Sequence, residues 1–122
     1  MESRVRMLIV EDDQEIRSML AQQFETEDFI VETTGDGVLA FSMIKENDYD
    51  LVLLDLKLPG MDGMTLLRGV NRIGRLPNVI VLTAVNDLST AQECMKLGAK
   101  DFISKPYDPE ELLGVIIRTL SA

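Results

Sequence analysis

Acidic residues directly follow two of the short apolar runs in this sequence. Glu11, Asp12 and Asp13 come at the end of one run, and Asp55 comes at the end of another. Carboxylates held close together repel one another unless a cation lies among them. Because the chain contains no histidine, oxygen atoms would be the donors, and they suit a hard cation such as Mg²⁺. The acids therefore predict a magnesium site, provided that the fold brings them together.

A hydroxyl group and an ammonium group follow two further apolar runs. Thr83 comes directly after residues 78–82, and Lys105 closely follows Ile103. A carboxylate beside Mg²⁺ and a lysine can act as a nucleophile towards phosphorus. Mg²⁺ and Lys105 would neutralise charge on the oxygens of a phosphoryl group during transfer. The acids, Thr83 and Lys105 together indicate phosphoryl transfer to a carboxylate.

Each of these residues also has an ordinary interpretation. An aspartate that follows a strand, such as Asp13, commonly caps the N-terminus of the next helix. Lys105 alone would be a surface lysine, and Thr83 alone would be a turn residue. These interpretations do not explain why all of the residues follow apolar runs, so the set as a whole favours the chemical one.

The elements that must position these residues are five apolar runs alternating with five segments of helical periodicity. The predicted strands are residues 5–10, 29–31, 51–54, 78–82 and 102–103. The run at 51–54 is apolar at every position, as expected for a strand covered on both faces. Strict alternation predicts an α/β fold, in one domain over residues 1–122, with a parallel sheet and helices on both of its faces.

The predicted helices carry apolar stripes that should face inward. Their members are Ile16, Met19, Leu20 and Phe24; Ala40, Phe41 and Ile44; Leu66, Leu67, Val70 and Ile73; Leu88, Ala91 and Met95; and Leu113, Ile116, Ile117 and Leu120. Gly98 is expected to cap the C-terminus of the fourth helix. Asp108 is expected as the N-cap of the fifth helix, with Pro109 at its first position.

A parallel sheet places the ends of its strands at a common edge. Ligands of such sheets bind outside the carboxyl ends of the strands. The acids, Thr83 and Lys105 each follow a strand, so they should meet at this edge although they are distant in sequence.

Composition narrows the classes of protein to which the chain can belong. Its 46% apolar residues suffice for one packed core, and no apolar run has the length of about 18 residues that a membrane helix needs. A formal charge of −9 disfavours nucleic-acid binding, which relies on clustered lysine and arginine. Cys94 is the single cysteine, which fits a reducing compartment, so a cytoplasmic location is expected.

The sequence resembles the receiver domains of bacterial response regulators over essentially its whole length. The segments that carry the resemblance are LIVEDD at 8–13, LLD at 53–55, LPGMDG at 58–63, LTA at 82–84, GAKDF at 98–102 and KP at 105–106. The resemblance implies a flavodoxin-like, doubly wound sheet of five parallel strands in the order 2-1-3-4-5 with five helices.

The same resemblance implies a role for each site residue. Asp55 would be the phosphorylation site, and Asp12, Asp13, Asp55 and the backbone carbonyl of Lys57 would hold Mg²⁺. The side chains of Thr83 and Lys105 would contact the phosphoryl group. A cis peptide bond would join Lys105 to Pro106, as family members usually have.

The resemblance also implies a switch and its partners. Thr83 and Phe102 would couple phosphorylation to the surface formed by the fourth helix, fifth strand and fifth helix. A sensor histidine kinase would donate the phosphoryl group, and an output domain, a partner protein or a second phosphorylated copy would bind the switched surface. The domain would catalyse only its own phosphorylation and slow dephosphorylation, and it would bind neither nucleic acid nor membrane. Phe102 lacks the hydroxyl that a tyrosine would supply there, and it could instead be an ordinary core aromatic.

Three other functions fit parts of the pattern. A flavin-binding protein of the same fold would need a loop rich in Ser, Thr and Gly after the first strand, where acids would repel the flavin phosphate. A phosphatase resembling the haloacid dehalogenase family would need an acid two residues after its nucleophile, where Lys57 stands. A receiver-like binding module that never accepts phosphate would be expected to lack one of the acids, Thr83 or Lys105, all of which are present.

Overall fold

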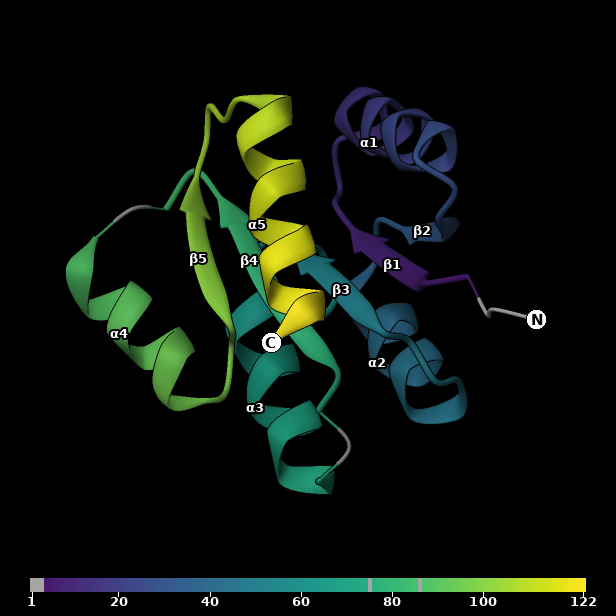
Figure 1. Ribbon diagram of the computed structural model, residues 1–122. Coiled ribbons are helices and arrows are strands. Elements are labelled where there is room, and N and C mark those ends of the chain that lie inside the picture. Colours follow the sequence, from purple (N-terminus) through teal and green to yellow (C-terminus); the bar gives the residue numbers. More distant parts are fainter. Residues whose placement is uncertain (1–3, 75, 86) are drawn as a thin grey trace.

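The computed structural model describes residues 4–74, 76–85 and 87–122 (Figure 1). Strands and helices alternate strictly along the chain. They are β1 (Arg6–Val10), α1 (Gln14–Thr26), β2 (Ile30–Thr34), α2 (Gly37–Glu46), β3 (Leu51–Leu54), α3 (Gly63–Ile73), β4 (Asn78–Thr83), α4 (Leu88–Lys96), β5 (Asp101–Ser104) and α5 (Pro109–Ser121). Within these described stretches, no helix combines the length and the apolar character needed to cross a membrane.

The strands form one parallel sheet in the order β2-β1-β3-β4-β5. The predicted flavodoxin-like fold and strand order are thereby confirmed. Strand β3 lies in the centre, and each of its four residues is at most 1% exposed, which explains why its sequence is continuously apolar. The edge strands β2 and β5 extend beyond the apolar runs that predicted them, because an edge strand also tolerates polar residues.

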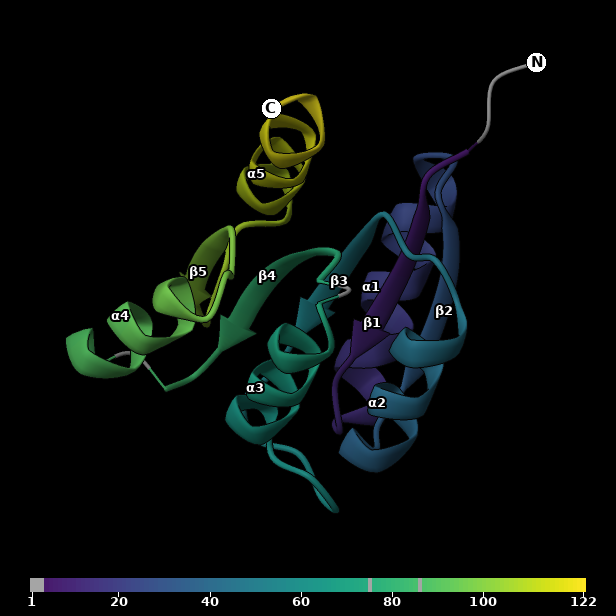
Figure 2. The same ribbon diagram turned by 90° about the horizontal axis from the view of Figure 1, so that it is seen from below.

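Helices cover the sheet on both faces (Figure 2). Helices α2, α3 and α4 pack on one face, where Leu8, Val52 and Val81 point towards them. Helices α1 and α5 pack on the other, against the intervening strand residues such as Ile9 and Leu53. The alternation of side chains along each strand thus divides the core into two layers.

Several residues predicted to face inward are exposed instead, so that part of the prediction is wrong. They are Met19 (63% exposed), Ile73 (42%), Leu88 (73%), Met95 (47%) and Ile117 (52%). A helix buries a stripe of residues on one side. Consecutive residues point in directions that differ by about 100°, so a residue next to a buried one in the sequence can lie outside the stripe. Thus α5 buries Leu112 and Ile116 rather than Ile117, and α4, at the edge of the sheet, buries only Cys94.

The ends of the helices follow the predicted capping residues closely. Asp108 caps α5 with Pro109 in its first turn, as expected. At the end of α4 the C-cap is Leu97, one position earlier than predicted, and Gly98 follows it with a φ of 100°.

An aspartate caps every helix at its N-terminus. The five N-caps are Asp13, Asp36, Asp62, Asp87 and Asp108, and each carboxylate accepts hydrogen bonds from amides of the first turn. Each helix follows a strand, so all five caps lie towards the carboxyl edge of the sheet. Five of the chain's negative charges therefore lie beside the positive ends of the helix dipoles, where they stabilise the helices.

Candidate functional site

The residues singled out in the sequence meet at the carboxyl edge of the sheet. Asp55 directly follows β3, and its amide donates a hydrogen bond of 2.9 Å to the carbonyl of Val10 at the end of β1. Its side chain is buried, as are those of Glu11 and Thr83 from the neighbouring strands. The parallel register of β1, β3 and β4 therefore brings together residues that are far apart in sequence.

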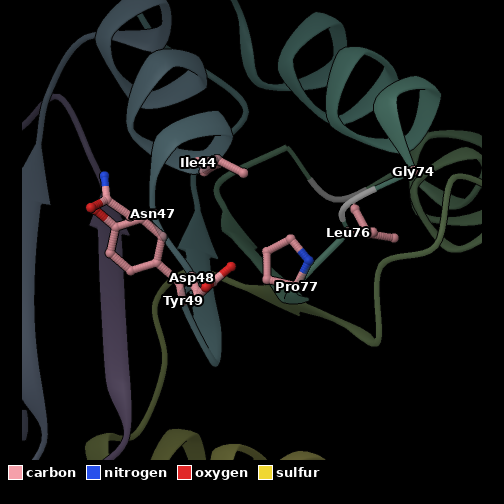
Figure 3. A pocket seen from close by; sticks show the side chains of 7 residues that line it. All are labelled: Ile44, Asn47, Asp48, Tyr49, Gly74, Leu76 and Pro77. Carbon is pink, nitrogen blue, oxygen red and sulfur yellow. The ribbon is translucent and has the colours of Figure 1, made fainter.

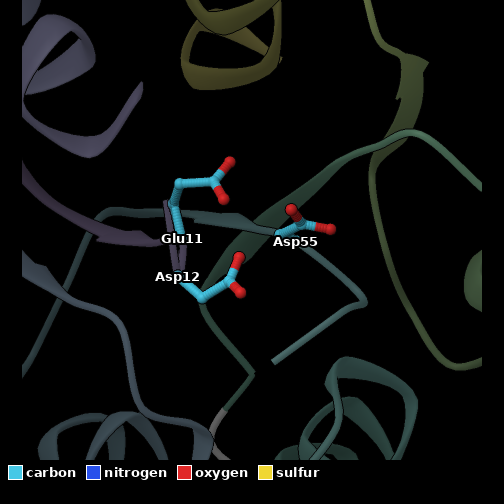
Figure 4. A group of neighbouring side chains, drawn as sticks. All are labelled: Glu11, Asp12 and Asp55. Atoms are coloured by element: carbon cyan, nitrogen blue, oxygen red, sulfur yellow. The ribbon is translucent and has the colours of Figure 1, made fainter. Parts of the chain in front are cut away.

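Three carboxylates form a cluster at this edge (Figure 4). One oxygen from each of Glu11, Asp12 and Asp55 lies within 4.8 Å of the others. Glu11 and Asp55 are buried, whereas Asp12 is exposed and open to water. The donors are all oxygen atoms, as a hard cation that keeps part of its water shell requires.

The structure separates Asp13 from this cluster. Its Oδ1 accepts hydrogen bonds from the amides of Glu15 (2.9 Å) and Ile16 (3.2 Å), so the carboxylate caps α1. The ordinary interpretation of Asp13 as an N-cap is confirmed. Glu11 occupies the cluster instead; it belongs to the predicted acidic run but was not predicted as a metal ligand.

Both carboxylate oxygens of Asp55 accept hydrogen bonds. Oδ1 accepts from the hydroxyl of Thr83 at 3.0 Å and from the amide of Lys57 at 3.1 Å, and Oδ2 accepts from Nζ of Lys105 at 2.9 Å. Burial alone would raise the pKa of Asp55, but these hydrogen bonds and the charge of Lys105 outweigh it and hold the pKa below its usual value. Asp55 is therefore held as an anion in a fixed orientation.

Lys105 bridges two of the three carboxylates. Besides Asp55, its Nζ contacts Oε1 of Glu11 at 2.5 Å. Burial opposes its charge, but the hydrogen bonds to Glu11 and Asp55 raise the pKa of Lys105 above its usual value. Burial raises the pKa of Glu11, against the hydrogen bonds that it accepts from Lys105 and from the amide of Asp13. Three carboxylates against one ammonium group leave an excess of negative charge, which suits a cation at Asp12.

The backbone around Asp55 is held by a close contact with the start of α3. The amide of Gly63 donates to the carbonyl of Leu56 at 2.9 Å. A Cβ atom on Gly63 would lie 2.5 Å from both the carbonyl oxygen of Asp55 and Cα of Leu56, so only glycine fits. This contact defines the path of the loop that carries Lys57, whose backbone carbonyl was predicted as a metal ligand.

The loop after β5 has the predicted cis bond between Lys105 and Pro106. The amide of Lys105 donates to the carbonyl of Thr83 at 2.9 Å, which ties this loop to the end of β4. Phe102 is half-buried in β5, beside Val81 of β4, and packs against the layer of α2, α3 and α4. Its role as a switch stays a prediction.

A hollow of about 260 Å³ lies away from these residues, at the opposite edge of the sheet (Figure 3). It is lined by Ile44, Asn47, Asp48, Tyr49, Gly74, Leu76 and Pro77. Tyr49 there donates a hydrogen bond of 2.6 Å to Glu32 of β2. Among the described residues that line it there is one carboxylate, and there is neither a nucleophile–base pair nor a cluster of metal donors, which directs attention to the carboxyl edge instead.

Comparisons with known proteins agree with the fold. A family model described as the response regulator receiver domain matches residues 7–117. Sporulation initiation phosphotransferase F of Bacillus subtilis is 35% identical over 94% of this chain and 93% of its own length. The DNA-binding response regulator MtrA of Mycolicibacterium paratuberculosis is 38% identical over 90% of this chain, which spans about half (48%) of that relative. A chain in the crystal structure of the CheX–CheY–BeF3–Mg²⁺ complex from Borrelia burgdorferi is 32% identical over 93% of this chain and 87% of its own, with a TM-score of 0.88.

Proposed function

The chain belongs to the response regulator receiver domain family of two-component signalling, and on that premise we propose that Asp55 accepts a phosphoryl group in a Mg²⁺-dependent reaction. One observation carries the proposal. The Asp55 carboxylate is buried, held by Thr83 and Lys105, and lies within 4.8 Å of two further acids. In the part of the chain that the structure describes, no other group of three acids lies so close together.

In the proposed reaction, an oxygen of Asp55 attacks the phosphorus of a phosphohistidine in a sensor kinase. The new P–O bond forms as the P–N bond breaks, and the histidine nitrogen keeps the electron pair of the broken bond. Lys105 is placed to neutralise a phosphoryl oxygen, and the Thr83 hydroxyl is placed to donate to another. Hydrolysis of the acyl phosphate would return the carboxylate, so the domain is a switch that turns over slowly.

Glu11, Asp12 and Asp55, with the backbone carbonyl of Lys57, are the residues that would hold Mg²⁺. The ion would supply positive charge to the phosphoryl oxygens. The predicted assignment of Asp13 as a ligand is not tested by the structure, but Glu11 is favoured because the Asp13 carboxylate already caps α1. Asp13 would then act by fixing the start of the helix that follows the acidic loop.

We place the readout of phosphorylation on the face formed by α4, β5 and α5. Leu88 and Met95 are exposed on α4, with Ala91 between them, so this face offers apolar surface to an output domain, a partner protein or a second copy. The amide of Val85 donates to the Thr83 hydroxyl at 3.3 Å, which links that hydroxyl to the loop before α4. A cytoplasmic location is part of the same proposal.

Incubation with Mg²⁺ and a small phosphodonor, followed by peptide mass spectrometry, tests the acceptor. We expect one phosphoryl group on Asp55 and none on the Asp55→Asn variant. Asp62→Asn is a matched control, since Asp62 is an exposed acid that caps α3. Stable label on Asp12 or Asp13, or full labelling of Asp55→Asn, would refute the assignment.

A further inference from the structure

Arg17 contacts the backbone of the acidic loop, and none of the roles described above includes it. Its Nη1 donates a hydrogen bond of 2.8 Å to the carbonyl oxygen of Glu11 and a longer one of 3.4 Å to that of Asp12. The guanidinium thus lies behind the two residues whose carboxylates join Asp55 in the cluster. Both of these acceptors are backbone oxygens, and the side chains of Glu11 and Asp12 point towards Asp55 (Figure 4).

Two features indicate that this contact is built into the fold. Arg17 is the fourth residue of α1, where its positive charge faces the positive end of the helix dipole and is therefore unfavourable for the helix. Gly35, in the loop after β2, leaves the space in which the guanidinium lies, since a Cβ atom there would come within 2.5 Å of Nη1. The helix itself does not favour a cation at this position. The two carbonyl oxygens do, because they accept hydrogen bonds from Arg17, and Gly35 leaves room for the guanidinium.

We propose that Arg17 is a positioning residue for the metal site. By bonding the carbonyls of Glu11 and Asp12, it holds the acidic loop in the conformation that presents both carboxylates to one cation. The proposal rests on the function proposed above, because it assumes that this cluster binds Mg²⁺. Partners that orient metal ligands in this way typically change metal affinity by about 10- to 100-fold when removed.

Geometry and charge predict opposite effects of removing Arg17. If the guanidinium only added positive charge near the site, Arg17→Gln would strengthen Mg²⁺ binding by removing a repelling cation. If it positions the loop, Arg17→Gln weakens Mg²⁺ binding, and we expect a loss of about tenfold. Arg17→Lys keeps the charge and one donor group, and it should recover part of the affinity.

Gly35→Ala provides an independent test of the same contact. The added methyl group should displace the flexible end of Arg17 and weaken Mg²⁺ binding about as much as Arg17→Gln does. In the double variant Arg17→Gln/Gly35→Ala, the methyl group has no guanidinium to displace and meets the loop backbone only at 3.3 Å (carbonyl oxygen of Glu11) and 3.4 Å (Cα of Asp12). The two effects should therefore not add, and the double variant should bind Mg²⁺ about as well as Arg17→Gln alone.

The experiment measures the Mg²⁺ dissociation constant from the rise in melting temperature with Mg²⁺ concentration, together with amide NMR spectra of the metal-free proteins. Arg118→Gln is the charge-matched control, because Arg118 is exposed in the last turn of α5, and it should bind Mg²⁺ as the wild type does. Arg17→Gln should also shift the amides of Asp12 and Asp13 before any metal is added. Equal or tighter Mg²⁺ binding by Arg17→Gln would overturn the positioning role while leaving the proposed function intact. If the wild type itself does not bind Mg²⁺, the proposed function fails. The Arg17 contact is then tested separately by the metal-free NMR spectra: amide signals of residues 11–13 that are the same in Arg17→Gln as in the wild type would overturn it.

Discussion

The hydroxyl of Thr83 donates a hydrogen bond of 3.0 Å to Oδ1 of Asp55, and both side chains are buried. A phosphoryl group on Asp55 would offer new oxygens to the same hydroxyl. Since Thr83 also accepts from the amide of Val85, any movement of its hydroxyl affects the loop that leads to α4. Thr83 is thus the residue through which a charge change at Asp55 can reach the surface.

Removing the Thr83 hydroxyl should uncouple the site from that surface. In the wild type, beryllofluoride and Mg²⁺ should shift NMR signals from the site as far as Phe102 and α4, because the hydroxyl follows the phosphoryl mimic. In Thr83→Ala the changes should shrink towards the site; a coupling of this kind typically amounts to about 1–3 kcal/mol. If the changes stay within the loops around Asp55 in both proteins, this switch route is wrong and Phe102 is an ordinary core residue.

Asp12 and Asp13 should respond differently to neutralisation. Asp12→Asn removes one of three clustered charges, so the metal-free protein should gain up to about 1 kcal/mol, and its stabilisation by Mg²⁺ should largely disappear. Asp13→Asn should change little, because asparagine is also a good N-cap, and its response to Mg²⁺ should match the wild type. Thermal melts with and without Mg²⁺ check both variants. Loss of the Mg²⁺ response in Asp13→Asn would instead support Asp13 as a ligand.

Two glycine substitutions should have opposite effects on stability. Gly63→Ala places a methyl group against the backbone of Asp55 and Leu56, and we expect a loss of about 1–3 kcal/mol with weaker phosphorylation. Gly114→Ala is the control. Gly114 lies within α5, and a Cβ atom at this position would meet nothing within 4 Å. It should gain about 0.5–1 kcal/mol from helix propensity. Urea unfolding measures both, and an equal response would mean that the loop at Gly63 adapts.

The hydrogen bond from Tyr49 to Glu32 should make stability depend on pH. The hydrogen bond from Tyr49 and, to a smaller extent, Arg6 lower the pKa of Glu32 in the folded protein. A carboxyl group whose pKa is lowered on folding stabilises the protein at pH values above its unfolded-state pKa. This stabilisation is lost as the pH falls through the folded-state pKa. Tyr49→Phe should therefore cost about 1 kcal/mol at neutral pH, a modest value because Glu32 is partly exposed. The difference from the wild type should shrink as the pH falls through the lowered folded-state pKa of Glu32, because the carboxylate then loses its charge. Urea unfolding across this range checks it, and a difference that does not vary with pH would contradict the role of the Glu32 charge.

The sequence by itself determined the order of the elements and the edge at which the chemistry lies. Strand β3 could be predicted because both of its faces are buried, so all four of its residues are apolar and the run is uninterrupted in the sequence. Asp55, Thr83 and Lys105 could be placed together because a parallel sheet brings the ends of its strands to one edge. Asp108, and the ordinary interpretation of Asp13, could be predicted as N-caps because a cap bonds only to its own helix.

Only the tertiary structure decided which neighbouring residues take which role. Glu11 and Asp13 are separated by one position, and the sequence does not distinguish them; the onset of α1 does, by using the Asp13 carboxylate as a cap and leaving Glu11 to meet Lys105. The same holds for Ile116 and Ile117, which both belong to the apolar stripe of α5. The way in which the helix packs on the sheet decides that Ile116 is buried and Ile117 is exposed. The contact between Arg17 and the acidic loop depends on the space that Gly35 leaves from another loop, so it exists only once the chain has folded.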